Sequence, residues 1–147
     1  MKNPSSRFAT ILICALPLLA APLITGCSQD PPGATLELKL SAGAKNLSRS
    51  DITKFSSHEI ELGDKDYKGA LLRDILGPIP PNATLRVKAT DGYSQSLNAA
   101  TAARDDCLLA YEKEGDPLTA PEGPLRLIVP NSPGLSVRSI VSIEILP

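Results

Sequence analysis

The chain has 147 residues, of which 42% are apolar and 21% charged, with a formal net charge of −1 and no tryptophan. This composition excludes a disordered tail, a strongly basic nucleic-acid-binding protein and a multispan membrane protein. The lysines and arginines stand singly among acidic residues, so the sequence has no basic stripe that could follow a phosphate backbone. We therefore expect no nucleic-acid partner.

The first 26 residues have the pattern of an exported protein. A basic start is followed by sixteen residues, Ala9 to Ile24, that carry no charge but contain two prolines. A membrane-spanning helix needs about 20 apolar residues, and each proline would remove a backbone donor that the bilayer cannot replace. We therefore interpret residues 1–26 as a signal peptide and not as a transmembrane helix.

The uncharged stretch ends in the sequence Leu23-Ile24-Thr25-Gly26-Cys27. It resembles the bacterial lipobox, in which an apolar residue and two small residues precede a cysteine that takes a lipid in thioether linkage. We predict that Cys27 is lipidated and anchors the chain to the bacterial cell envelope, facing the periplasm or the outside, with the inner or outer membrane left open. Residues 27–34 would then form a lipidated tether. The alternative is an unmodified cysteine at the end of an ordinary signal peptide.

Residues 35–147 remain as one domain, which is long enough to bury an independent core. If Cys14 leaves with the signal peptide and Cys27 carries lipid, Cys107 is the one free thiol, so an internal disulfide and a four-cysteine zinc site are excluded. His58 is the single histidine, which also argues against a histidine-rich metal site. We predict that Cys107 is a buried small hydrophobic residue, with metal ligation as the alternative.

The first half of this domain alternates between strand and helix patterns. Polar and apolar residues alternate from Thr35 to Leu40 and from His58 to Leu62, which predicts two strands. The hydroxyl oxygen of Ser48 or Ser50 can cap a short helical turn through Ile52 to Phe55. The apolar residues from Gly69 to Leu76 have helical spacing, and Gly77 can end that helix.

The second half is richer in strands. Thr84 to Thr90 predicts a strand with its even-numbered positions exposed, and the Asp91-Gly92 turn makes it a hairpin with Tyr93 to Leu97. The remaining predicted elements are a helix from Ala99 to Arg104 capped by Asn98, and strands at Cys107 to Tyr111, Leu125 to Val129 and Ile140 to Leu146. We predict an α+β fold of mostly antiparallel β-sheets with short inserted helices.

Four motifs follow one another along this domain: Tyr67-Lys68-Gly69-Ala70-Leu71-Leu72-Arg73-Asp74-Ile75-Leu76, Asp91-Gly92-Tyr93-Ser94, Leu108-Leu109-Ala110-Tyr111 with Gly115-Asp116-Pro117-Leu118, and Gly123-Pro124-Leu125-Arg126-Leu127-Ile128-Val129-Pro130. Their order resembles the oxidoreductase molybdopterin-binding domain of the sulfite oxidase family, and the resemblance implies that fold for residues 35–147. In the family's enzymes, a cysteine that ligates molybdenum follows the strand that is His58 to Leu62 here. This chain continues Gly63-Asp64-Lys65-Asp66-Tyr67, without a cysteine.

For three side chains within these motifs, the sequence predicts the environment. Arg126 lies between two leucines of a predicted strand, so we expect it on the opposite face in a surface ion pair with an acid, with anion binding as the alternative. Tyr93 and Tyr111 are expected to pack as core aromatic residues with their hydroxyls at an edge.

The missing cysteine leads us to expect a membrane-tethered, non-catalytic lipoprotein that binds a small ligand or an envelope protein. We assign it no catalytic residue, no metal ligand and no cofactor. The candidate binding surface is the edge of the cavity that the family's cofactor would occupy, near His58, Asp64, Asp66 and Tyr67, although a solvated surface there is the simpler interpretation. The alternative function is a minimal molybdopterin-dependent oxidoreductase of the cell envelope, whose molybdenum is held by Cys107 or by no protein sulfur.

Overall fold

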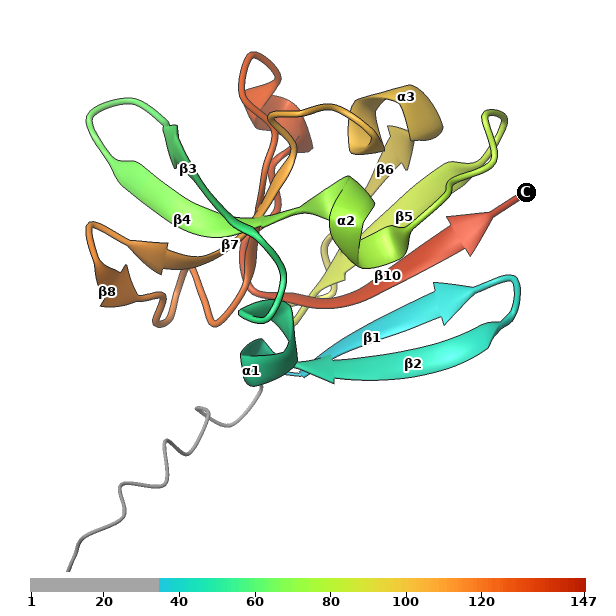
Figure 1. The fold of residues 1–147 in the computed structure, drawn as a ribbon, viewed down its shortest axis with the longest axis horizontal. Coiled ribbons are helices and arrows are strands. Elements are labelled where there is room, and N and C mark those ends of the chain that lie inside the picture. The colour runs from blue at the N-terminus through green and yellow to red at the C-terminus, as the bar shows by residue number, and fades with distance from the viewer. Residues whose placement is uncertain (1–34) are drawn as a thin grey trace, which may run out of the picture.

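The computed structural model describes residues 35–147, which form two five-stranded β-sheets with short helices between the strands (Figure 1). Cys27 and the predicted segments 1–26 and 27–34 lie outside the described residues, so the signal peptide, the lipid anchor and the tether stay predictions. No helix among residues 35–147 is long and apolar enough to cross a membrane.

The first sheet contains the strands β1 (Thr35–Leu40), β2 (Gly43–Ser48), β5 (Thr84–Ala89), β6 (Ser94–Asn98) and β10 (Ile140–Leu146). Their order across the sheet is β2-β1-β10-β5-β6. β1 pairs with β10 in parallel, and the other neighbours are antiparallel. The predicted hairpin around Asp91-Gly92 is confirmed, because β5 pairs with β6 across that turn.

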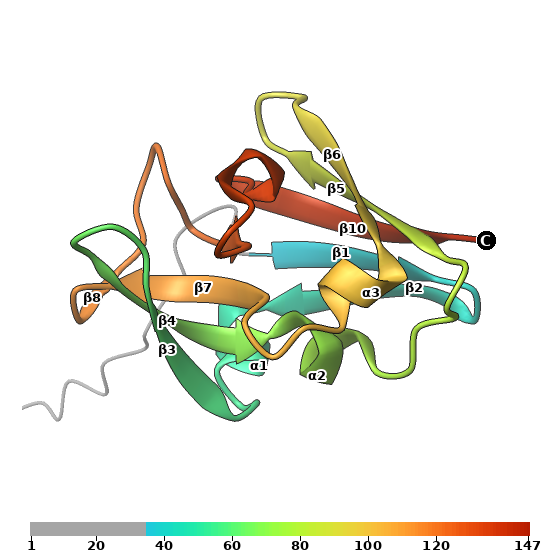
Figure 2. The same ribbon diagram turned by 90° about the horizontal axis from the view of Figure 1, so that it is seen from above.

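The second sheet contains the strands β3 (Ser57–Glu61), β4 (Asp66–Leu71), β7 (Leu108–Lys113), β8 (Asp116–Pro117) and β9 (Arg126–Ile128). Its order is β3-β4-β7-β8, and β9 also pairs with β7. Every pair in this sheet is antiparallel. The β3–β4 and β7–β8 hairpins project together on the side away from the C-terminus in both views (Figures 1 and 2).

The helices of the described chain are short: α1 (Arg49–Ile52), α2 (Leu72–Leu76), α3 (Ala99–Ala102) and the 3₁₀ turn η1 (Pro133–Leu135). The cap predicted at Asn98 is confirmed, and of the two serines predicted to cap the first helix, Ser48 is the cap. The prediction that this helix continues to Phe55 is wrong, because it ends at Ile52. The Ser48 hydroxyl accepts from the backbone N–H of Asp51 at 3.1 Å, and the Asp51 carboxylate accepts from the backbone N–H of Ser48 in return. The Asn98 side chain accepts from the backbone N–H of Thr101 at 2.7 Å. Such caps satisfy first-turn amides that have no partner within the helix.

The main core combines apolar side chains of both sheets with residues of the helices. Strand alternation places them as predicted: Leu85 and Val87 are fully buried, whereas Arg86 and Lys88 of the same strand are exposed. A second, smaller core covers the opposite face of the second sheet and consists of Tyr67, Leu71, Leu108, Ala110, Leu118 and Ile128. The prediction of mostly antiparallel sheets with short inserted helices is confirmed.

The helix predicted from Gly69 begins later, at Leu72, because residues 66–71 form β4. A Cβ atom on Gly69 would lie 2.6 Å from the Ala110 Cα and still closer to the carbonyl oxygen of Leu109. The glycine therefore permits close strand pairing, and this pairing outweighs the helical spacing of the sequence.

The two tyrosines predicted to lie in the core differ in how far they are buried. Tyr111 is 3% exposed and belongs to the main core, as predicted. The prediction for Tyr93 is wrong: it is 49% exposed, and its hydroxyl donates to the Gln95 side chain at 2.9 Å. Tyr93 directly precedes β6 at the tip of the hairpin, beyond the part of the sheet that packs on the core.

Candidate functional site

An irregularity in the second sheet brings a lysine beside an aromatic ring. The register of β4 against β7 shifts between Lys68 and Gly69, so Tyr111 is an extra residue in β7. An extra residue reverses which face the following side chains occupy. Lys113 therefore lies directly opposite Tyr67 on the same face of the sheet, with its Nζ atom 5.6 Å from the centre of the Tyr67 ring.

Arg126 approaches the same ring from β9. Its guanidinium carbon lies 4.9 Å from the centre of the Tyr67 ring, and its Nη1 donates to the Tyr67 hydroxyl at 2.8 Å. Arg126 is only 8% exposed. Two cations from different strands thus share one aromatic ring, an arrangement that the negative face of the ring favours.

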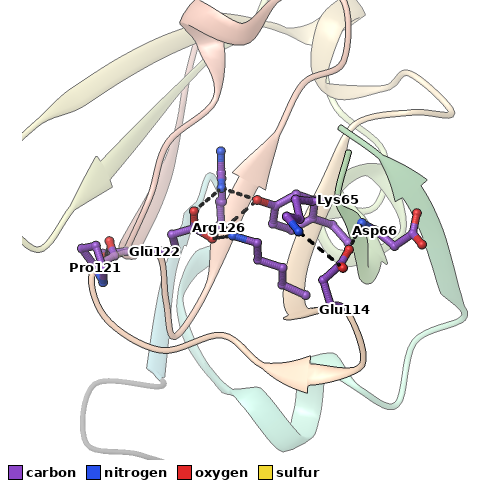
Figure 3. A network of polar contacts seen from close by, with 9 residues as sticks. Lys65, Asp66, Glu114, Pro121, Glu122 and Arg126 are labelled. Carbon is purple, nitrogen blue, oxygen red and sulfur yellow. Dashed lines mark hydrogen bonds and ion pairs between the residues drawn. The ribbon is translucent and has the colours of Figure 1, made fainter. Parts of the chain in front are cut away.

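Glu122 completes this group, which we call the Tyr67 cluster: Tyr67, Lys113, Glu122 and Arg126. Figure 3 labels Glu122 and Arg126, which lie side by side. The Oε1 atom of Glu122 lies 3.1 Å from Arg126 Nη1, and its Oε2 atom accepts from Lys113 Nζ at 3.1 Å. The Tyr67 hydroxyl donates to Oε2 at 3.5 Å. One carboxylate therefore bridges both cations.

The electrostatics of the Tyr67 cluster follow from this geometry. Burial would raise the pKa of Glu122, but the hydrogen bond from Lys113 and the charges of Arg126, Lys113 and Arg138 outweigh it, so the pKa is lowered. The hydrogen bond to Glu122 in turn raises the pKa of Lys113. Both groups are therefore charged at neutral pH.

The expectation for Arg126 is correct in one part and wrong in another. It pairs with an acid, Glu122, as predicted, but the pair does not lie on the surface. The face opposite the flanking leucines carries the second core, including Tyr67 and Ile128, and these residues cover the arginine. Among the buried side-chain atoms of residues 35–147, Arg126 Nε is the one without a hydrogen-bond partner.

The backbone that presents Glu122 is held by several hydrogen bonds. The N–H of Glu122 donates to the Thr119 carbonyl at 3.0 Å, and the Glu122 carbonyl accepts from the N–H of Ser139 at 3.0 Å. The Ser139 hydroxyl is close to the carbonyls of Pro121 and Gly123, at 3.0 and 2.9 Å. The Glu122 side chain, in contrast, is 21% exposed, so its carboxylate lies at the accessible edge of a fixed loop.

Two hollows flank the Tyr67 cluster. One, of about 460 Å³, is lined by Lys113, Glu114 and residues 116–122. The other, of about 340 Å³, is lined by Glu59, residues 66–68, Glu112 and residues 114–115. Segments 57–68 and 111–122 contain eight acidic and three basic side chains, so the surroundings of both hollows are acidic.

Of the four residues predicted to line a cavity, Asp66 and Tyr67 both line the hollow of about 340 Å³, whereas His58 and Asp64 do not. His58 and Tyr67 share one face of the second sheet, because His58 pairs with Gly69, two positions from Tyr67. The Asp66 side chain belongs to the opposite face by strand alternation. Its backbone N–H donates to the Glu114 side chain at 2.7 Å. Asp64 is exposed in the β3–β4 turn. Of the four, Tyr67 alone belongs to the Tyr67 cluster.

Sequence reasoning missed Lys113 and Glu122 and considered Arg126 for anion binding only as an alternative. These residues come together through the extra residue in β7 and through the loop after β8. A motif search in one sequence gives no signal for either feature, because both depend on pairing between distant segments.

Comparison with known proteins agrees with the resemblance seen in the sequence. The family model described as "Oxidoreductase molybdopterin binding domain" matches residues 36–147. The chain belongs to this family. The crystal structure of the sulfane dehydrogenase SoxCD from Paracoccus pantotrophus is similar, with a TM-score of 0.64 and 18% sequence identity. The similarity covers 76% of this chain and 37% of that chain, and at this identity it shows the fold alone. No curated protein sequence matches.

Membership of the molybdopterin-binding family raises the question of whether the described residues fit a molybdenum centre. Cys107, the thiol of residues 35–147, is fully buried, as predicted. Burial, together with the charge of Asp106, raises the pKa of this thiol to about 12, so the free thiol stays protonated at neutral pH. The turn after β3 offers the Asp64 carboxylate and no sulfur. Within residues 35–147, no three His, Cys, Asp or Glu side chains are grouped to hold a metal ion. These residues therefore do not fit a thiolate-ligated molybdenum centre.

Proposed function

We propose that this protein is a lipid-anchored, non-catalytic binding module of the bacterial cell envelope, which uses the fold of the molybdopterin-binding family to bind a small ligand or an envelope protein. The observation that carries the proposal is the position of Cys107. Its sulfur lies inside the main core, with no exposed surface and a raised pKa. A redox centre of the family's kind would need a thiolate on the surface of a cavity.

The Tyr67 cluster supports a binding function in a second way. Its side chains come from β4, β7 and β9 and from a loop held by backbone hydrogen bonds. Rigid strands fix the direction of donors such as the Arg126 guanidinium before a ligand arrives, which lowers the entropic cost of binding. The hollows beside the cluster provide a surface on which a ligand or a partner can rest.

The proposed anchor sets where the binding surface would work. Cys27 precedes the first described strand by eight residues. Fully extended, such a segment reaches at most about 28 Å. A domain on so short a tether meets partners close to the membrane surface, which is why we propose envelope proteins or small envelope solutes as its ligands.

The experiment that tests the binding function measures the cofactor directly. The full-length protein is produced in a host that makes the molybdopterin cofactor, and its molybdenum per chain and pterin fluorescence are determined after purification. We expect far less than one molybdenum per chain. Family membership keeps a minimal molybdopterin-dependent oxidoreductase as the second candidate, and near-stoichiometric metal that disappears in Cys107→Ser would favour it.

The anchor has a separate test. Cells that produce the full-length protein are labelled with palmitate, and Cys27→Ala serves as the control. We expect label in the wild-type chain and none in the variant. An unlabelled wild-type chain would refute the lipid anchor and leave the binding function to be judged by its own experiment.

A further inference from the structure

The Glu122 carboxylate occupies a site that is well suited to a carboxylate. Each oxygen contacts a different cation, Arg126 on one side and Lys113 on the other, and Tyr67 donates to one of them. These three contact groups come from three strands of the second sheet, whereas Glu122 comes from the loop before β9. The strands therefore form a receptor for a carboxylate, and a side chain of the loop fills it.

The receptor has more donors than Glu122 uses. Arg126 Nη1 makes both the contact with Glu122 and the one with Tyr67. Nε is buried without a partner, and the hydrogen bonds and ion pairs found within residues 35–147 include none from Nη2. A carboxylate that binds arginine in its preferred bidentate manner engages two guanidinium nitrogens at once. Glu122, restrained by its own loop, engages one.

The charge balance also favours a further acceptor. Within the Tyr67 cluster, Lys113 and Arg126 carry two positive charges and Glu122 supplies one negative charge between them, while the exposed Glu114 also interacts with Lys113. Arg138 adds positive charge near the same carboxylate. The Arg126 guanidinium is largely removed from water, so it is stabilised when an anion with hydrogen-bonding capacity approaches it.

We propose that Tyr67, Lys113 and Arg126 form a binding site for the carboxylate of an external ligand, and that the Glu122 side chain occupies this site in the free protein. The proposal rests on the proposed function in that it names the ligand chemistry of the binding module. Exchange needs a rotation of the Glu122 side chain and no movement of the loop backbone, which Ser139 and Thr119 hold in place. Lys113 and Glu122 both line the hollow of about 460 Å³, so a ligand in this hollow reaches the Lys113 side of the site first.

The carboxylate can come from a small organic acid or from the C-terminus of a polypeptide. The rim of the hollow carries two exposed acids, Glu114 and Asp116. These acids would attract basic side chains that precede the terminal carboxylate of a polypeptide and would repel a small acid with several negative charges. The ligand class is thus a carboxylate whose remainder is neutral or basic.

The test measures binding of three probes to the full-length protein in detergent by isothermal titration calorimetry at constant ionic strength. The probes are acetate, an arginine-arginine-alanine tripeptide with a free C-terminus, and the same tripeptide with an amidated C-terminus. We expect the free tripeptide to bind most tightly, acetate to bind more weakly and the amide to bind least. Equal affinity for the free and amidated tripeptides would overturn the proposal.

Two substitutions change the site in opposite directions. Glu122→Gln keeps the shape of the side chain but removes the competing charge, so the free tripeptide should bind about tenfold more tightly. Lys113→Met removes one cation and should weaken binding about tenfold in the otherwise unchanged protein. Lys88→Met, on the exposed face of the first sheet, is the matched control and should leave the affinity unchanged.

The outcomes separate this proposal from the proposed function. Unchanged affinity in both Glu122→Gln and Lys113→Met would overturn the carboxylate site, even if the protein holds no molybdenum. If Glu122→Gln fails to fold, Lys113→Met decides alone. Molybdenum at near-stoichiometric levels would overturn the proposed function, whereas tripeptide binding that depends on Lys113 would still establish the site.

Discussion

The two faces of the second sheet are closed in different ways. The face toward the first sheet packs apolar residues such as Leu109 and Leu127 into the main core. The opposite face has a smaller apolar group, and the Tyr67 cluster borders it. Apolar packing tolerates many combinations of side chains of similar volume, whereas a buried arginine needs its specific partners. The first face therefore stabilises the fold by apolar packing, and we propose that the second face is where this chain binds a ligand.

The largest loss of stability should come from the close contact between β4 and β7, the strands that carry both faces of the second sheet. Gly69→Ala places a methyl group against the backbone of β7, at 2.6 Å from the Ala110 Cα. Because backbone cannot move aside as a side chain does, we expect a loss of about 4 kcal/mol in the free energy of unfolding. Chemical denaturation measures it. Gly134→Ala, where the added methyl group meets open space, is the matched control. Equal stability of the two variants would show that the strands are not packed as closely as described.

The next largest loss of stability should come from a substitution on the face of the second sheet that carries the Tyr67 cluster. Arg126→Met removes one partner of a largely buried pair and leaves Glu122 facing Lys113 alone, so we expect a loss of about 2 kcal/mol in the free energy of unfolding. The double variant Arg126→Met with Glu122→Leu should lose less than the sum of the two single variants, because the partners interact. Additive losses in urea denaturation would contradict the pairing.

A smaller difference is expected between the wild type and Glu122→Gln in how stability depends on pH. The pKa of Glu122 is lower in the folded chain than in the unfolded one, so its contribution to stability is complete above the unfolded pKa and is lost as the pH falls through the folded pKa. Glu122→Gln should therefore lose less stability than the wild type between neutral and acidic pH. Asp51, whose pKa is also lowered, by Lys54 and Ser48, should keep part of the acid dependence in both proteins. Parallel pH profiles of unfolding would contradict the ion pair.

The smallest effect is expected at the exposed turn between β3 and β4. Asp64 is exposed, and the hydrogen bonds and ion pairs found within residues 35–147 include none from its side chain. Asp64→Asn should change the free energy of unfolding by no more than about 0.5 kcal/mol and should leave tripeptide binding unaltered. A marked loss of binding in calorimetry would move the ligand site from the Tyr67 cluster to the turn.

The parts of the fold that were predictable are those in which one face of a strand is buried. Polar and apolar residues alternate in Thr35–Leu40 and in Thr84–Ala89. This pattern predicts both strands even when the strands they pair with are unknown. Gly43–Ser48 was not predicted, because Leu47 is its one buried residue and the strand has no apolar alternation. The strand Asp66–Leu71 was missed for the opposite reason, since its apolar residues also fit a helix.

The candidate site was less predictable than the fold. Tyr67 was chosen for its place beside the missing cysteine, and it belongs to the cluster through contacts that are far apart in sequence. Lys113 faces it through an extra residue in a strand, and Glu122 reaches it from a loop. Such contacts depend on strand register, which a single sequence leaves open.

Our central proposal is that this member of the family binds a ligand with its fold and does not hold a molybdenum centre. The most direct measurement is anomalous X-ray diffraction at the molybdenum absorption edge, on crystals of the full-length protein purified from a host that makes the cofactor. We predict no anomalous peak beside the β3–β4 turn or beside Cys107. A peak at full occupancy at either position would contradict the claim.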